Sequence, residues 1–322
     1  MRVILWLSAL TALLILSPTR AEAAACAVAP AVAGNMGSIT SYDLRAGSAP
    51  VVTLPSTLTC SGSVVSVMPG DYARATATSG NSFRLKSASG ASIGYRLSAD
   101  SGGTMKFTQG STIDFLDSSV LSLLTILTSN SFMPTLYAAP TEAPNVPAGT
   151  YTDTVTIAWS WRICRVIGVG ALGVRICVVE DSGTATATVA VSLTVSADCR
   201  ILAPPVNFGS APLASGFADV SQAVAVDCTQ GTSYKVAFTS GTSGASRPWR
   251  SMTDGAGNRL EYNLYRSDGS TIWDEGNPLP GTDPGTGATT PTQLFRYIAR
   301  INAGSTPSAG SYSDVVSVVV SF

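Results

Sequence analysis

Four short sequence landmarks occur twice in this chain in the same order, and this repeat limits the folds that the chain can adopt. The first copy begins at Cys26 and the second at Cys199. The other matched segments are residues 36–38 and 208–210, 58–60 and 226–228, 93–97 and 260–264, and 148–153 and 309–314. Because 322 residues also exceed the usual size of one domain, the repeat predicts two domains with a common architecture.

The last landmark of each copy runs into a stretch with apolar residues at every second position, which is typical of a half-buried strand. These residues are Val155, Ile157, Trp159 and Trp161 in the first copy, and Val316, Val318, Val320 and Phe322 in the second. Many such short stretches, separated by Gly, Pro, Asp and Ser, predict an all-β fold of two sandwich domains.

The two copies differ after this strand. Phe322 aligns with Trp161 and is the last residue, whereas the first copy continues to a second alternating stretch at residues 184–198. Its apolar positions include Val189, Val191, Leu193 and Val195. We expect this stretch to fold back, antiparallel to the strand ending at Trp161, as the last strand of the first domain.

The second copy has no counterpart of residues 184–198, so its sandwich is predicted to be one strand short. A missing strand exposes apolar core and unpaired backbone groups, which is unfavourable in water. A strand from another chain would cover the exposed core and pair with the free backbone groups, a binding mode called β-augmentation. Val316, Val318, Val320 and Phe322 are then the expected edge of an acceptor groove.

The start of the chain has the pattern of a secretory signal peptide, which we assign to residues 1–23. We expect an exported chain with an N-terminal sandwich at 24–198 and a C-terminal sandwich at 199–322. Residues 23–26 also weakly resemble a lipoprotein processing site with Cys26 lipidated. Arg20 and Glu22 argue against this alternative, because they separate the apolar core of the leader from Cys26.

The six cysteines of an exported chain predict disulfides. Our proposed pairs are Cys26 with Cys60, Cys164 with Cys177, and Cys199 with Cys228, while other connectivities stay open. The connection between Trp161 and Thr184 contains an apolar segment bracketed by Cys164 and Cys177. Its candidate surface-binding residues are Val166, Ile167, Val169, Leu172, Val174 and Ile176. The alternative is that they pack over the sandwich edge.

The composition argues against an enzyme. The chain has no histidine, which excludes Ser-His-Asp and Cys-His pairs and most catalytic zinc sites. Charged residues make up 12% of the chain and the net charge is −1, so no nucleic-acid footprint is present. We expect no cofactor, no catalytic residue and no metal site. A further apolar stretch at residues 120–127 is expected to be a core strand rather than a ligand site.

The second copy resembles the spore coat protein U domain, which is found in subunits of archaic chaperone-usher pili. The resemblance lies in residues 198–199, 206–209, 224–228, 260–265, 271–273 and 309–314. It covers residues 199–322 well. In the first copy it is limited to the cysteines, the segment around Tyr95 and residues 148–153.

The resemblance implies immunoglobulin-like sandwiches, of which the C-terminal one is completed by a donor strand. Ordinary subunits of such pili carry an N-terminal donor extension similar to residues 184–198, but here that stretch is internal and Cys26 follows the leader almost directly. We therefore expect a two-domain tip adhesin at the cell surface, acting in attachment and biofilm formation. The implied partners are a pilus subunit that donates a strand, a periplasmic chaperone, an outer-membrane usher, and a hydrophobic or host surface. The alternative is a secreted structural coat or matrix protein.

Overall fold

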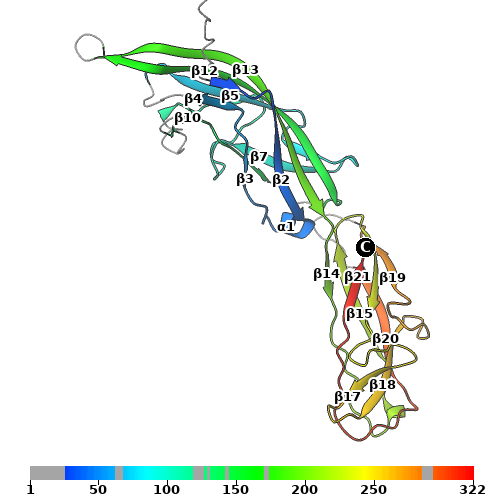
Figure 1. Cartoon of the computed structure of the whole chain (residues 1–322). Coiled ribbons are helices and arrows are strands. Elements are labelled where there is room, and N and C mark those ends of the chain that lie inside the picture. Colours follow the sequence, from blue (N-terminus) through cyan, green and yellow to red (C-terminus); the bar gives the residue numbers. More distant parts are fainter. Residues whose placement is uncertain are drawn as a thin grey trace, which may run out of the picture.

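The computed structural model describes residues 26–61, 68–118, 127–128, 131–141, 145–169, 174–284 and 293–322. They form two β-sandwiches placed end to end in an elongated molecule (Figure 1), and the expectation of an all-β fold is confirmed. The predicted leader at 1–23 and residues 120–126 of the apolar stretch lie outside the described residues. In the described ranges, no helix is both long enough and apolar enough to cross a membrane.

The N-terminal sandwich contains a nine-stranded and a four-stranded sheet. The larger sheet consists of β2 (Ala31–Thr40), β3 (Val52–Leu54), β5 (Tyr72–Ser79), β6 (Arg84–Lys86), β7 (Ser92–Ser98), β8 (Thr112–Asp114), β11 (Leu136–Pro140), β12 (Gly149–Val169) and β13 (Arg175–Ser196). The smaller sheet consists of β1 (Cys26–Val28), β4 (Leu58–Ser61), β9 (Leu127–Thr128) and β10 (Ser131–Phe132). The short helix α1 (Ser41–Arg45) follows β2, and Thr40 caps its first turn.

The longest elements are β12 and β13, which form one antiparallel hairpin that extends beyond the sandwich (Figure 1). Val155 pairs with Val189 and Trp161 pairs with Gly183, so the inward positions of the two strands face the core together. The predicted final strand therefore lies in β13, antiparallel to the strand that holds Trp161. It begins at Arg175 rather than at residue 184, because residues 175–182 continue to pair with the outer part of β12.

On its other side, β13 pairs in parallel with β2. The strand thus has hydrogen-bonded neighbours on both edges. Its inward side chains Val189, Val191, Leu193 and Val195 are at most 2% exposed. Residues 184–196 are therefore an integral strand of the N-terminal core.

The C-terminal sandwich contains a five-stranded and a three-stranded sheet. The five strands are β14 (Cys199–Leu202), β15 (Val220–Cys228), β17 (Arg250–Thr253), β18 (Arg259–Arg266) and β20 (Gln293–Ile301). The three strands are β16 (Ser233–Phe238), β19 (Leu279–Thr282) and β21 (Val318–Ser321), and a 3-10 turn, η2 (Ala214–Gly216), precedes β15. The sequence predicts a strand from Val316, but regular pairing begins only at Val318, where β16 becomes the partner of β21.

The predicted disulfide pairs are confirmed: Cys26–Cys60, Cys164–Cys177 and Cys199–Cys228. The first joins β1 to β4 and the third joins β14 to β15, in each case between residues directly opposite on antiparallel strands. The second lies across the outer part of the β12–β13 hairpin. The two sandwiches therefore carry their first disulfides at equivalent places.

The repeat is also visible in side-chain contacts. The hydroxyl of Tyr151 donates to the backbone carbonyl four residues upstream at 2.6 Å, and the hydroxyl of Tyr312 does the same at 2.7 Å. Such a tyrosine corner fixes the entry into a strand of a sandwich. The landmark at residues 148–153 and 309–314 thus forms a tyrosine corner in both copies.

The two sandwiches meet at α1. The Tyr42 ring lies between two guanidinium groups, with the Cζ of Arg45 at 4.4 Å and that of Arg200 at 4.1 Å from its centroid. The Tyr42 hydroxyl donates to the carbonyl of Asp227, whose carboxylate lies 3.5 Å from Arg45. Burial and the nearby Asp227 raise the pKa of Tyr42. Tyr42 and the Arg45–Asp227 ion pair therefore both join the two sandwiches.

Candidate functional site

A groove of about 610 Å³ with a mixed apolar and polar lining lies in the C-terminal sandwich between two chain segments, residues 203–211 and 310–316. Its floor is made of core side chains of the sandwich: Phe238, Met252, Leu260, Tyr262, Leu264, Tyr297 and Ile301. Among the described residues, no strand lies between the two walls. Within the described ranges, residues 203–211 pair with no strand, and β21 pairs only with β16.

The walls of this groove correspond to the strands that hold β13 in the N-terminal sandwich. Gly37 in β2 and Gly209 in the groove wall have φ values of 85° and 75°, which favour glycine. Each glycine N–H donates to the side-chain oxygen of the asparagine two residues before it, at 2.7 and 2.8 Å. The 203–211 wall thus repeats β2, and residues 310–322 repeat the first part of β12.

Burial differs sharply between these equivalent segments. In β12, which pairs with β13 along this whole stretch, the inward residues Tyr151, Val155, Ile157 and Trp159 are at most 2% exposed. Their counterparts Tyr312, Val316, Val318 and Val320 are only partly buried, and Phe322 is 70% exposed. The groove is therefore the place that β13 occupies in the N-terminal sandwich.

A tyrosine–aspartate pair anchors the same wall in both copies. The hydroxyl of Tyr95 donates to Asp153 at 2.7 Å, and the hydroxyl of Tyr262 donates to Asp314 at 2.6 Å. Asp314 also accepts a hydrogen bond from the backbone N–H of Thr242 at 2.8 Å. Burial and the bond to the carboxylate raise the pKa of both tyrosines, so both stay neutral. These contacts fix the 310–316 wall to β18 and to the loop after β16.

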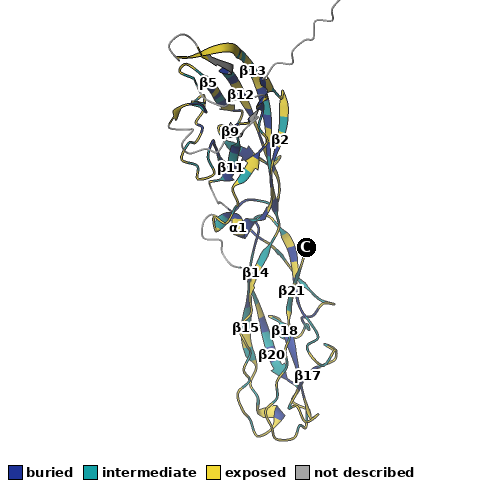
Figure 2. Cartoon of the chain, turned by 60° about the vertical axis from the view of Figure 1, so that its left-hand side comes forward, coloured by how far each residue is buried: buried dark blue, intermediate teal, exposed yellow. Residues whose placement is uncertain are grey.

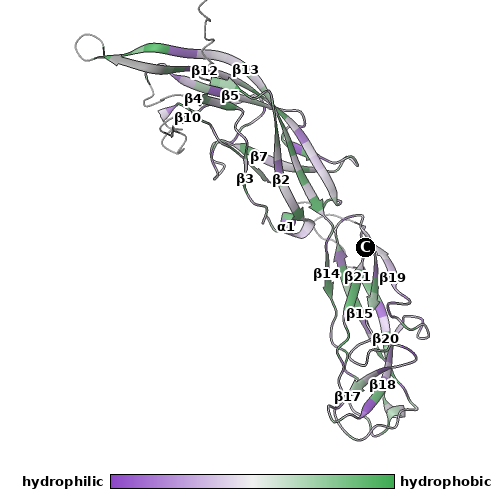
Figure 3. Cartoon of the chain, in the orientation of Figure 1, coloured by the Kyte–Doolittle hydropathy of each residue, from purple (hydrophilic) through white to green (hydrophobic). Residues whose placement is uncertain are grey.

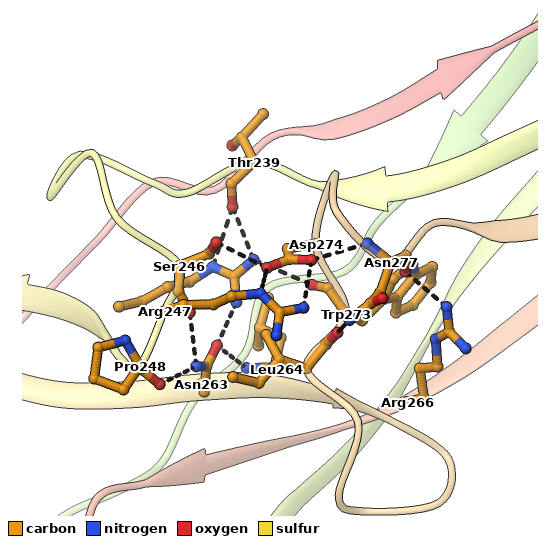
Figure 4. Close-up of polar contacts among 12 residues, drawn as sticks. Thr239, Ser246, Arg247, Pro248, Asn263, Leu264, Arg266, Trp273, Asp274 and Asn277 are labelled. Atoms are coloured by element: carbon orange, nitrogen blue, oxygen red, sulfur yellow. Dashed lines mark hydrogen bonds and ion pairs between the residues drawn. The ribbon is translucent and has the colours of Figure 1, made fainter.

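A buried arginine takes part in the polar network around Thr239 and Trp273, whose labelled members Figure 4 shows. Arg250 is fully buried, and its Nη2 donates to the carbonyls of Thr239 and Trp273 at 3.0 and 3.1 Å. The N–H of Thr239 in turn donates to the carbonyl of Ser317 at 2.9 Å, and the Thr239 Oγ1 accepts from the N–H of Ser317 at 3.0 Å. The network therefore fixes the chain just before β21.

Beside this network, the Asp274 carboxylate accepts from Arg247 at 2.8 Å and from Ser246 at 2.9 Å. Burial alone would raise the pKa of Asp274, but these hydrogen bonds and the guanidinium charge outweigh it and lower the pKa. The amide of Asn263 joins the same loop to β18 through the carbonyls of Ser246 and Pro248, both at 2.9 Å. Residues 246–248 are thus tied by hydrogen bonds to Asp274 and to β18.

The structure distributes the four predicted edge residues differently. Val316 lines the groove, whereas Val318 and Val320 lie on β21 and pack against the C-terminal core. Phe322 follows β21 and is mostly exposed. The sequence analysis did not identify Phe208 and Tyr262 as residues that line the groove. Both lie in repeated landmarks, and this repetition was the signal that could have pointed to them.

The outer end of the β12–β13 hairpin forms a second exposed apolar surface (Figures 2 and 3). Of the predicted tip residues, Val169, Val174 and Ile176 are 76%, 59% and 47% exposed. They do not pack over the sandwich edge, which was the alternative expectation. Val178 and Val179, which were not predicted, are exposed as well. Leu172 and the side chains of Val166 and Ile167 lie outside the described residues.

The chain belongs to the Spore Coat Protein U domain family, whose model matches residues 11–158 and 185–319. The two matched stretches follow the two copies of the repeat. Residues 159–184, which include the outer part of the β12–β13 hairpin, are outside the match. The described residues hold no group of three or more side chains that could together bind a metal ion.

The fold is similar to a chain of the CsuC–CsuE chaperone–tip adhesion subunit complex from archaic chaperone-usher Csu pili of Acinetobacter baumannii. The two chains are 22% identical, with a TM-score of 0.64, over 92% of this chain and 100% of that one. The CupB6 tip adhesin from Pseudomonas aeruginosa also matches, with 14% identity over 92% of each chain, but its TM-score of 0.31 is too low to compare folds. No curated protein matches the chain.

Proposed function

We propose that this chain is the tip adhesin of a chaperone-usher pilus, and that its C-terminal sandwich accepts a donor strand from the next subunit. The observation that carries this proposal is the groove between residues 203–211 and 310–316. Its walls repeat the two strands that enclose β13, and its floor is apolar core. A donated strand would cover the floor and pair with the open edge of β21, which is β-augmentation.

The strand that could serve as a donor is already in use within the N-terminal sandwich. β13 is hydrogen-bonded on both edges, and its inward valines and Leu193 are buried. Releasing it would expose the whole N-terminal core. The chain therefore accepts a strand without giving up β13, which suits the distal end of a fibre.

Family membership and the similarity to a tip adhesion subunit held by its chaperone support the proposed partners. These are a strand-donating pilus subunit, a periplasmic chaperone that protects the groove before assembly, and an outer-membrane usher. They also support export through the periplasm to the cell surface. Neither the family nor the fold is that of an enzyme.

The exposed end of the hairpin supports adhesion as the role of the N-terminal sandwich. Val169, Val174, Ile176 and Val178 are exposed at the end farthest from the C-terminal sandwich, and Cys164–Cys177 braces that end. Large apolar side chains exposed together at one end of a molecule are typical of an interaction site. We propose that they contact hydrophobic or host surfaces and so promote attachment and biofilm formation.

A structural coat or matrix protein is the second candidate, and the family description favours it. Such a protein would use the same groove for assembly but would need no exposed apolar end. Replacing Val169 and Val174 by serine distinguishes the two. For an adhesin, attachment of cells to polystyrene should fall while the amount of secreted protein stays equal. A Thr186→Ser variant on the exposed face of β13 is the control.

The test of the groove is refolding of the chain from residue 24 onward with a synthetic peptide that copies residues 184–197. We expect the peptide to raise the unfolding midpoint of the C-terminal sandwich only. At a peptide concentration of 100 times the dissociation constant, the gain should be about 2.7 kcal/mol. A scrambled peptide is the control. A chain that is monomeric, stable and unaffected by the peptide would contradict the proposal.

A further inference from the structure

The side chains that β13 directs into the N-terminal core change in size along the strand. In order they are Gly183, Ala185, Ala187, Val189, Val191, Leu193 and Val195. At the small end, a Cβ on Gly183 would lie 2.5 Å from the ring of Trp161, so the tryptophan fills that space. Volume for a large strand side chain is thus available only toward the C-terminal half of β13.

In the C-terminal sandwich, the open volume of the groove likewise lies where the C-terminal half of a donor strand would be. The β12 partners of Val189, Val191, Leu193 and Val195 correspond by the repeat to Val316, Asp314, Tyr312 and Gly310. All four of these residues line the groove. The residues that correspond to the partners of Ala187, Ala185 and Gly183 are Val318, Val320 and Phe322, and none of them lines it.

The core beside β21 is filled from the neighbouring strand instead. β16 places Tyr234 and Val236 where β5 has Ala73 and Ala75, and both are at most 3% exposed. Small residues on β21 therefore do not leave a deep pocket for a donor at that end.

The backbone of the other wall, residues 203–211, independently indicates that only the C-terminal half of a donor strand can be fully paired. In the N-terminal sandwich, Val32 and Ala33 pair with Val189 and residue 190 of β13. By the repeat their counterparts are Pro204 and Pro205, which have no N–H to donate. A donor can pair with this wall as with β2 only from Val206 onward, opposite the position of Val191. Both walls are therefore complete only for the C-terminal half of a donor.

From these two observations we infer that the groove selects its donor strand by bulky aliphatic side chains at the positions of Val189, Val191, Leu193 and Val195. The N-terminal half of the donor adds pairing with β21 but little discrimination. The partner is a strand with alternating Val, Leu or Ile in its C-terminal half. This inference rests on the proposed strand-accepting function and adds which part of the donor is recognised.

Three peptides test the inference by refolding with the chain from residue 24 onward and measuring the dissociation constant by fluorescence anisotropy. The first copies residues 184–197. The second carries Val191→Ala and Leu193→Ala, and the third carries Ala185→Ser and Ala187→Ser. We expect the second to bind about a hundredfold more weakly or worse, since five buried carbons are lost, and the third to change by less than about threefold.

The outcomes separate this inference from the function on which it rests. Equal weakening by both substituted peptides, or no weakening by the second, would overturn the inference and leave the strand-accepting function intact. Failure of all three peptides to bind would overturn both. Binding of the third peptide like the first, together with loss of the second, is the result that supports selection by the C-terminal half.

Discussion

Alanine substitutions at Val155 and Val316 make the same chemical change at equivalent positions, one covered by β13 and the other in the open groove. Val155 is 0% exposed, so truncation removes about two buried carbons and leaves a cavity. At about 0.8 kcal/mol per buried carbon plus a cavity contribution, Val155→Ala should lower the free energy of unfolding by about 2 to 3 kcal/mol. Val316 is only partly buried, so Val316→Ala should cost less than about 1 kcal/mol.

The assay is urea unfolding of the full chain. Hydrogen exchange, measured on proteolytic fragments from each sandwich, follows the unfolding of the two sandwiches separately. A donor peptide should increase the cost of Val316→Ala toward that of Val155→Ala, because the donor buries Val316 as β13 buries Val155. The cost of Val155→Ala should not change. If Val316→Ala costs as much as Val155→Ala without any peptide, the groove face is already covered and the reasoning is refuted.

Three further outcomes follow from the structure. Replacing Cys164 and Cys177 together by serine opens a loop with a sequence separation of 13 residues, which should lower the free energy of unfolding by about 3 kcal/mol through chain entropy. Attachment to polystyrene should fall as well. Unchanged attachment would show that the disulfide is not needed to brace the hairpin end. Because burial raises the pKa of Tyr95 and Tyr262 above the unfolded value of about 10, their stabilisation is complete below that pH and is lost as the pH rises above it. Thermal unfolding from pH 8 to 11 should show this fall, and Tyr262→Phe should make it shallower for the C-terminal sandwich; an unchanged slope would contradict the role of burial. Arg250→Met leaves the carbonyls of Thr239 and Trp273 without this donor, so it should lower the free energy of unfolding of the C-terminal sandwich by about 2 to 5 kcal/mol, measured in urea. It should also weaken binding of the donor peptide. Lower stability with unchanged peptide binding would show that Arg250 does not support the groove.

Much of the architecture could be predicted because it depends on local patterns. Alternation placed Val189, Val191, Leu193 and Val195 in one strand, since only one face of a strand can point into a core. The repeat placed Tyr151 and Tyr312 at equivalent points, and both form the same corner. Pairing the cysteines in their order along the chain gave the three disulfides of the structure, although the sequence left other connectivities open.

The candidate site was predicted less completely, because it depends on contacts between segments far apart in the sequence. Nothing local to Phe208 indicates that it faces Tyr262, with ring centroids 6.2 Å apart. Val318 and Val320 alternate like Val316, but they lie on β21 beside β16, whereas Val316 precedes β21 and lines the groove. The start of β13 at Arg175 was also missed, since residues 175–180 are exposed and lack the alternation of a half-buried strand.

The path of the chain from the hairpin to the C-terminal sandwich has a mechanical consequence. The hydrogen bonds between β12 and β13 run perpendicular to the strands, so tension along β13 loads them in shear and spreads the force over the whole ladder. The chain then enters β14 at Cys199, where the disulfide to Cys228 passes the load directly to β15 in the interior of the five-stranded sheet. In the described residues, a load that enters the N-terminal sandwich through β12 therefore reaches the C-terminal sandwich through a sheared ladder and a disulfide, and not by peeling one hydrogen bond at a time.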